Sequence, residues 1–285
     1  MMHTFARLVS LSVGKLTFAV AAAIGCLVCH PTWGSTEISL PDDATSVECS
    51  LGNRYGYEDY LSANRPWSVG LKKNKSNARF GPNFIRFELR KGDCGSGDCR
   101  RTPKYERTEF AQLETNQSKP GQQIWWGWSF YVPPGYKDGG KDLRSAYGTS
   151  FAQFQQCCRY EPAFMFIKHV DGPFRVSSFR TVPTAPQRGF DLISDKDFRG
   201  RWHDFIVQAK WSLKKDGFFK VWVNGKLKAD YRGPTMTKGN KTIYHKFGLY
   251  RSAHSANPSR QWAYFDEIRR GKTRACVDIR RLTQK

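Results

Sequence analysis

Short segments in which apolar and polar residues alternate recur along most of the chain, and glycine- or proline-rich turns separate them. Alternation with a period of two is typical of β-strands that bury one face. The clearest case is the segment 218–223, followed by Asn224-Gly225 and then by 226–229, because Asn-Gly favours the type I′ turn of a β-hairpin. The pattern therefore predicts strands rather than helices.

The other segments of this kind fit one antiparallel fold. The predicted strands cover residues 84–90, 105–110, 122–132, 150–156, 163–170, 174–182, 202–211, 218–223, 226–229, 244–251 and 262–269. The segment 202–211 taken alone would also fit a short helix, and 35–80 is rich in loops with short edge strands at most. Trp126, Trp128 and Phe130 are expected in the core. Many short strands without regular helices or a repeat predict an all-β fold, an antiparallel β-sandwich of the jelly-roll (concanavalin A-like) kind.

The N-terminus has the composition of an export signal. Arg7 and Lys15 precede an apolar run over 16–29, and cleavage is expected after Gly34. The run is too short for a membrane span, and no later stretch approaches the required length. We therefore expect a signal peptide over 1–34, a single domain over 35–285, no membrane span, and a secreted or periplasmic location.

Cysteine usage fits an oxidising compartment. Six cysteines follow the expected signal peptide: Cys49, Cys94, Cys99, Cys157, Cys158 and Cys276. Cys94 and Cys99 enclose a flexible four-residue loop and are expected to pair, and a Cys49–Cys276 bridge would join the two ends of the domain. The adjacent Cys157 and Cys158 would then form a vicinal disulfide, or the partners are exchanged. The spacing does not match a zinc site.

The net charge of +21 predicts a polyanionic partner or an anionic surface. Export and the lack of a recognised nucleic-acid-binding motif argue against nucleic acid as that partner.

The segment Tyr244–Ser252 reads Y-H-K-F-G-L-Y-R-S. As a strand, it would place Lys246, Gly248 and Tyr250 on one face and His245, Phe247, Leu249 and Arg251 on the other. The glycine would leave a dip in the first face, where another group can approach the backbone closely. On earlier strands, Arg107 shares a face with Glu109, and Phe151, Gln153 and Gln155 are expected to share another. Arg107 and Glu109 would alternatively form only a cross-strand ion pair.

These motifs, in this order, carry a resemblance to a known family. They are Arg107-Thr108-Glu109, Gln153-Phe154-Gln155, the K-F-G-L-Y run of 246–250 and the Y-F-D-E-I run of 264–268. Over about 84–271 the chain resembles the heparin-lyase-I-like group of jelly-roll polysaccharide lyases, which is related in fold to alginate and glucuronan lyases. The resemblance implies a concave substrate-binding sheet and cleavage of a uronic-acid-containing polysaccharide by β-elimination. The partner would be an acidic polysaccharide. An alternative is a non-catalytic binding module on the same fold.

The resemblance also implies roles for individual residues. Arg107 and Gln153 would hold the substrate carboxylate and stabilise the charge that develops on it. Tyr250 would protonate the departing oxygen and would also serve as the base if nearby cations lower the pKa of its phenol. The predicted substrate-binding residues are Lys246, Gln155, Arg86, Glu109 and Arg251.

One departure from the family pattern bears on the base. Related lyases commonly carry a histidine where this chain has Gln155, and an amide does not accept a proton usefully. Either Tyr250 alone serves as base and acid, or a histidine from elsewhere, His169 or His245, supplies the base.

No cofactor is expected. Loop Asp and Asn residues leave room for a calcium ion, but the D-x-D-x-D-G pattern is absent and no metal ligands are assigned. A monomer is expected, although the sequence leaves the oligomeric state open.

Overall fold

The protein is described by a computed structural model that covers residues 57–59, 65–75, 77–101, 104–139, 148–157, 161–178 and 189–281. The expected signal peptide over 1–34, Cys49 and Cys158 lie outside these residues. Within them, helical structure is limited to the four-residue α1 (Ser96–Cys99) and to 3-10 turns at Glu114–Asn116, Asp195–Asp197 and Ile279–Arg281. None of the helices in the described part of the chain is long and apolar enough to cross a membrane.

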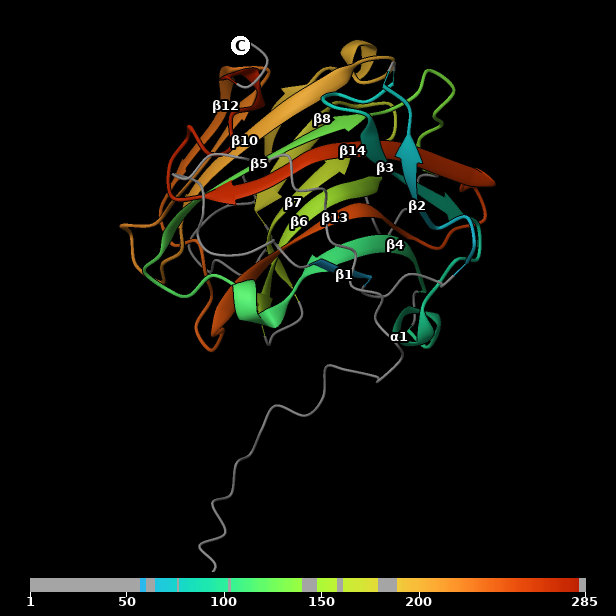
Figure 1. Cartoon of the computed structure of the whole chain (residues 1–285). Coiled ribbons are helices and arrows are strands. Elements are labelled where there is room, and N and C mark those ends of the chain that lie inside the picture. The colour runs from blue at the N-terminus through green and yellow to red at the C-terminus, as the bar shows by residue number, and fades with distance from the viewer. Residues whose placement is uncertain are drawn as a thin grey trace, which may run out of the picture. The chain divides into compact units, whose positions relative to one another are not determined.

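The described strands form two seven-stranded sheets that stack on each other (Figure 1). Sheet A contains, in spatial order, β1 (Tyr57–Asp59), β4 (Tyr105–Gln112), β13 (Thr242–Ser252), β6 (Thr149–Cys157), β7 (Pro162–Lys168), β8 (Phe174–Ser178) and β9 (Gly189–Ile193). Sheet B contains β12 (Lys226–Arg232), β11 (Phe218–Val223), β10 (Trp202–Lys210), β5 (Gln123–Tyr131), β14 (Arg260–Gly271), β3 (Asn83–Arg90) and β2 (Val69–Lys73). All the strand pairings are antiparallel, so the expected β-sandwich is confirmed.

The core lies between the two sheets and is mainly aromatic. Trp126 of β5 packs against Phe154 of β6 with ring centroids 4.9 Å apart, and Trp128 packs against Phe166 of β7 at 5.2 Å. Phe130 is fully buried beside them. Burying one such side chain stabilises the folded state by roughly 1.5–3 kcal/mol, so the burial of this aromatic layer is the main interaction that holds the two sheets together. The predicted core positions on β5 are confirmed.

The local predictions for sheet B are confirmed as well. Asn224 and Gly225 both have positive φ angles, 48° and 84°, as a type I′ turn requires. The segment 202–211 forms a strand and not a helix, since β10 pairs with β5 on one side and with β11 on the other. Its alternating apolar side chains can be buried against the opposite sheet only in the extended conformation.

Two features of sheet A differ from the expectation. The short strand β9 was not predicted, because five residues at a sheet edge carry little periodic signal. On β6, the register shifts between Ser150 and Ala152. This bulge turns Phe151 into the core, where it is fully buried, so Phe151 does not share a face with Gln153 and Gln155 as predicted.

The cysteines follow the predicted pattern in part. Cys94 and Cys99 form the expected local disulfide. Cys157 is also disulfide-bonded. Cys276 is buried, and its sulfur lies 3.2 Å from Thr273 Oγ1. The Cys49–Cys276 bridge stays a prediction, because Cys49 lies outside the described residues.

Candidate active site

The outer face of sheet A, which points away from sheet B, gathers polar residues from three adjacent strands. Arg107 on β4 lies opposite Tyr250 on β13, and Gln153 on β6 lies opposite Lys246 on β13. Their neighbours Phe247 and Leu249 are fully buried in the core, so alternation along β13 directs Lys246 and Tyr250 outward. The structure therefore brings the arginine, the glutamine and the tyrosine together on one face, as predicted.

Gly248 separates Lys246 from Tyr250 along β13. It has a φ angle of 134°, and a Cβ atom there would lie 2.3 Å from the Thr108 carbonyl oxygen of β4. The register with β6 shifts in this stretch of β13. The glycine thus permits a close approach, as predicted, but the approaching group is the backbone of β4.

Arg107 is held by two carboxylates. Its Nε and Nη2 donate to Asp98 at 2.8 and 3.1 Å, and its Nη1 donates to Glu109 at 3.1 Å. Burial alone would lower the pKa of Arg107, but Glu109 and Asp98 outweigh that effect and raise it. The guanidinium is therefore a permanent charge in the site.

Asp98 is a site residue that the sequence did not reveal. It belongs to α1, inside the loop closed by the Cys94–Cys99 disulfide, and it is buried. The loop brings this carboxylate onto Arg107. The only signal for Asp98 in the sequence was its position between two cysteines that were expected to pair. That position does not indicate which basic residue the carboxylate would bind.

Glu109 connects Arg107 to Gln153. The Gln153 Nε2 donates to Glu109 Oε1 at 2.6 Å, while Arg107 binds the other carboxylate oxygen. The ion pair that the sequence allowed for Arg107 and Glu109 does form, but it joins two residues of the same strand, β4, and does not cross between strands. Because it also orients Gln153, it is part of the cluster rather than an alternative to it.

Tyr250 lies on top of Arg107. The guanidinium carbon is 4.2 Å from the centre of the Tyr250 ring, and Tyr105 stacks on the same ring with centroids 5.3 Å apart. Burial raises the pKa of Tyr250 above its usual value, and Arg107 only partly offsets the effect. The prediction that nearby cations lower this pKa is wrong, because the cost of ionising a buried phenol is larger than the attraction to one guanidinium.

Lys246 has the opposite shift. Its side chain is 4% exposed and faces the charged groups Arg107, Glu109, Asp98 and Arg101. Burial and the Arg107 charge lower the pKa of Lys246 to about 7, although the two carboxylates oppose them. Near neutral pH a large fraction of this amine is unprotonated and able to accept a proton.

Gln155 and His169 are the two remaining predicted site residues, on β6 and directly after β7. Gln155 is partly exposed on the outer face of sheet A, opposite Tyr244 of β13. His169 follows the last residue of β7, and its carbonyl accepts a hydrogen bond from Lys168 Nζ at 2.7 Å. The roles predicted for these two residues stay predictions.

Two predicted site residues face the core instead. Arg251 Nε donates to Glu106 Oε2 at 2.6 Å, and both side chains are almost fully buried. His245 Nδ1 lies 3.0 Å from the Tyr57 hydroxyl, and burial lowers the pKa of this imidazole to about 3. Both side chains point away from the face that carries Tyr250, so the proposals of Arg251 as a substrate ligand and His245 as the base are wrong.

Arg86 lies on the other sheet. It is on β3 in sheet B, where its guanidinium forms an ion pair with Glu88. Arg86 is therefore not part of the Arg107 cluster, and its substrate-binding role stays a prediction. In the described part of the chain, no group of three or more His, Cys, Asp or Glu side chains could hold a metal ion.

Comparisons with known proteins concern the family and the fold. A family model described as Polysaccharide lyase matches residues 50–269. In structure, the chain is similar to an endo-beta-1,4-glucuronan lyase from the fungus Trichoderma reesei, with 16% identity and a TM-score of 0.58 over 77% of this chain and 92% of that chain. At this identity the likeness concerns the fold.

Two further similarities are to alginate lyases. Alginate lyase A1-II', a member of polysaccharide lyase family-7, has 13% identity and a TM-score of 0.48 over 66% of this chain and 79% of that chain. Alginate lyase vAL-1 from Chlorella virus has 15% identity and a TM-score of 0.45 over 73% and 93%. No curated protein sequence matches the chain.

Proposed function

Because the chain belongs to the polysaccharide lyase family, we propose that it cleaves a uronic-acid-containing polysaccharide by β-elimination and leaves a 4,5-unsaturated uronate at the new end. The observation that carries the proposal is the cluster of Arg107, Gln153, Lys246 and Tyr250 on one face of sheet A. The net charge of +21 supports an anionic polymer as the substrate.

The chemistry requires a group that holds the uronate carboxylate. The C5 proton is only weakly acidic because the adjacent carboxylate is already negative, so donors must stabilise the charge that develops on it. Arg107 uses three of its five N–H groups on Asp98 and Glu109. The others, with the second N–H of the Gln153 amide, are the donors that would bind the substrate.

Tyr250 fits the role of the acid. Since burial keeps the phenol protonated, it can deliver its proton to O4 as the bond between C4 and O4 breaks. The same property makes Tyr250 a poor base, which weakens the hypothesis that it performs both steps.

Lys246 fits the role of the base. It lies four residues before Tyr250, on the same face of β13, and directly opposite Gln153 of β6. The neutral amine would take the C5 proton, and the electrons left behind would form the C4–C5 double bond as O4 leaves. Lys246 gains one proton and Tyr250 loses one, so the charge of the site is conserved. This lysine would replace the histidine whose position Gln155 occupies, and His169 is the remaining alternative.

Acid and base on one face suit syn elimination, in which the C5 hydrogen and O4 leave from the same side, as in D-glucuronate and D-mannuronate. The fold similarity to a glucuronan lyase supports glucuronan as the first polymer to test. We also propose that the protein is exported, since a disulfide such as Cys94–Cys99 is typical of oxidising compartments.

The test is to incubate the protein with glucuronan, alginate and heparin and to follow the ultraviolet absorbance of the 4,5-unsaturated uronate. We expect absorbance to rise with at least one of these polymers. The Tyr250→Phe variant should release no product and still bind the polymer, because the ring and its contacts with Arg107 and Tyr105 are kept. Binding by the parent protein without any new absorbance would indicate a non-catalytic module, and full activity of Tyr250→Phe would remove Tyr250 from the mechanism.

A further inference from the structure

A second group of basic residues lies on the outer face of sheet B, on the opposite side of the sandwich from the Arg107 cluster. The chain leaves β14 at Gly271 and crosses back over this face. Val277 lies so close to Gly127 of β5 that a Cβ atom at Gly127 would be 2.2 Å from the Val277 carbonyl oxygen. Val277 also packs with Ile206 and Cys276 in a small apolar cluster of its own. The C-terminal segment is thus firmly seated on sheet B.

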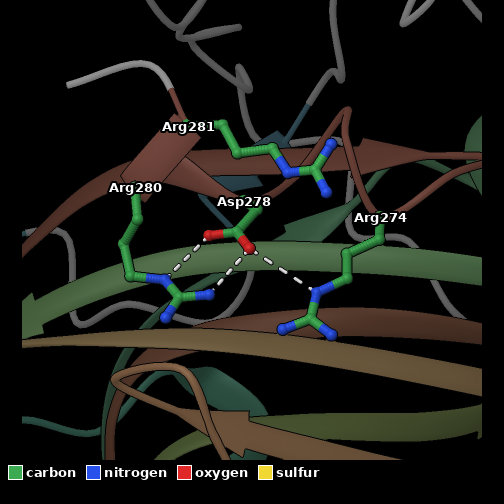
Figure 2. Close-up of a pocket in the computed structure, with 4 residues that line it drawn as sticks. All are labelled: Arg274, Asp278, Arg280 and Arg281. Atoms are coloured by element: carbon green, nitrogen blue, oxygen red, sulfur yellow. Dashed lines mark hydrogen bonds and ion pairs between the residues drawn. The ribbon is translucent and has the colours of Figure 1, made fainter. Parts of the chain in front are cut away.

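This segment forms a pocket of about 380 Å³ lined by Arg274, Asp278, Arg280 and Arg281, which we call the arginine pocket (Figure 2). Three guanidinium groups and one carboxylate give it two excess positive charges. Asp278 is only 4% exposed, and Arg280 lowers the pKa of its carboxyl despite the opposing effect of burial, so the carboxylate stays ionised.

The surrounding structure fixes Arg280 in place. Its Nε and Nη2 donate to the two oxygens of Asp278 at 2.9 and 2.8 Å. Its guanidinium lies over Gly225 in the β11–β12 turn, where a Cβ atom would be 1.6 Å from Nη1. Gly225 therefore has two roles: it adopts the positive φ angle that the turn requires, and its lack of a side chain leaves space for Arg280.

Arg274 is positioned by an aromatic stack. Its guanidinium carbon lies 4.9 Å from the centre of the Trp222 ring, and Trp222 stacks on Trp125 at 5.6 Å. Its Nε is 3.5 Å from Asp278. Like Arg280, it is pre-organised, so little conformational entropy would be lost when it binds a ligand.

Arg281 has no such partner. Figure 2 shows its side chain beside the other three residues, with no hydrogen bond or ion pair drawn to any of them. Among the described residues, its guanidinium makes no hydrogen bond or ion pair. An exposed cation beside two that are held in place is unnecessary for the fold, and its five N–H donors match the geometry of an oxyanion.

We propose that the arginine pocket binds a carboxylate or sulfate group of an acidic glycan chain, as a second site for the polymer. The identity of the polymer rests on the proposed function, whereas the anion site rests on the pocket itself. Arginine rather than lysine suits this ligand, because its planar fork binds carboxylates and sulfates through two parallel hydrogen bonds. A single compact pocket fits one anionic group better than the long row of phosphate contacts that nucleic acid requires.

Two sites on opposite faces have a consequence for long polymers. A short oligosaccharide can occupy only one site, but a long chain, once bound at one face, presents its other segments to the second site at a high effective concentration. The pocket should therefore strengthen binding of long chains and leave the turnover of short ones unchanged.

The experiment measures binding of a long glucuronan or alginate chain in the Tyr250→Phe background, where no cleavage interferes. We expect Arg281→Ser to weaken binding roughly tenfold, the value of one charge-assisted hydrogen bond. The matched control is Arg232→Ser, which removes an arginine with a 71% exposed side chain at the other end of β12 and should change binding less than twofold. With Tyr250 intact, Arg281→Ser should cleave a short oligouronate at the parent rate.

Equal loss of binding in both variants, or no loss in either, would overturn the proposal. A single-stranded oligonucleotide of equal charge serves as the competitor, and tighter binding of it than of the polyuronate would reassign the pocket to nucleic acid. The outcomes separate the two proposals. If no polymer is cleaved, the proposed function fails while the binding assay still tests the pocket. If the parent cleaves the polymer and Arg281→Ser binds it normally, only the pocket proposal fails.

Discussion

Strands β4 and β13 together carry one arginine on each face of sheet A, Arg251 on the inner face and Arg107 on the outer face. The surroundings of these two arginines differ sharply. On the inner face, Arg251 pairs with Glu106, and Arg251 Nη1 also donates to Gln261 at 2.9 Å. On the outer face, one residue away along each strand, Arg107 lies over Tyr250 and beside Lys246. The two sets are built from the same strands with the same alternation.

The comparison shows what separates a stabilising network from a reactive one. The inner arginine and carboxylate neutralise each other, and an amide completes the hydrogen bonds. The outer cluster contains a lysine whose pKa is lowered to about 7 and a tyrosine whose pKa is raised, so one group is ready to accept a proton and the other holds one. Perturbed pKa values of this kind are frequent at functional sites.

The largest effect is expected from Lys246. Replacing it with Gln should lower kcat/KM by about 10²–10⁴, the usual contribution of a general base. In the parent protein, kcat/KM should rise with pH up to about 7 and then level off, because only the neutral amine accepts a proton. The measurement is the initial rate of unsaturated product formation between pH 5 and 9, in roughly half-unit steps.

The Lys246→Arg variant is the matched control for this prediction. Arginine keeps the positive charge but cannot act as a base near neutral pH. Loss of activity in both variants supports a base. Activity of Lys246→Arg close to the parent value would show that Lys246 only binds the substrate, and attention would return to Tyr250 and His169.

The next effect concerns the inner face. Arg251→Met leaves the buried Glu106 without its cation, which should lower the free energy of unfolding by about 3–5 kcal/mol. Urea denaturation measures the change. The double variant Arg251→Met/Glu106→Gln should recover part of the loss, since no uncompensated charge remains. A stable but inactive Arg251→Met protein would contradict the assignment of this residue to the fold.

Over any one pH unit, a smaller effect should follow from His245. Its pKa is about 3 in the folded protein but near 6.5 in the unfolded chain, so the unfolded state takes up a proton first as the pH falls. Stability should therefore decrease from about pH 6.5 towards pH 3, by up to about 1.4 kcal/mol per pH unit. Urea midpoints at several pH values test this, and His245→Gln, which can still bond Tyr57, should show a shallower decrease. The same slope in both proteins would contradict the prediction.

Much of this arrangement could be predicted from the sequence, because alternation is a strong signal. It predicted most strands, the Asn224-Gly225 turn and the outward direction of Lys246 and Tyr250. It also placed His245 and Arg251 on the opposite face of their strand. Their proposed roles in the site came from residue type and family resemblance. The structure places both side chains where the alternation predicted them, away from the site.

The rest depends on features that a linear pattern does not contain. The bulge between Ser150 and Ala152 reverses Phe151 locally, and Asp98 reaches Arg107 only through a disulfide-closed loop. The direction of the pKa shift of Tyr250 depends on how deeply its ring is buried, which the presence of nearby cations does not reveal. Each of these is set by three-dimensional contacts between distant parts of the chain.

The smallest effect is expected from Arg86, which tests whether the two sheets have separate roles. Its partner Glu88 also accepts a hydrogen bond from Arg90 at 2.7 Å, so Arg86→Ser leaves that carboxylate with a cation. We expect a loss of stability within about 1 kcal/mol, as for other partly exposed ion pairs, and kcat/KM within twofold of the parent value. Urea denaturation and the product assay measure both. A large loss of activity without loss of stability would mean that cleavage itself depends on Arg86, and the assignment of the reaction to the outer face of sheet A alone would have to be abandoned.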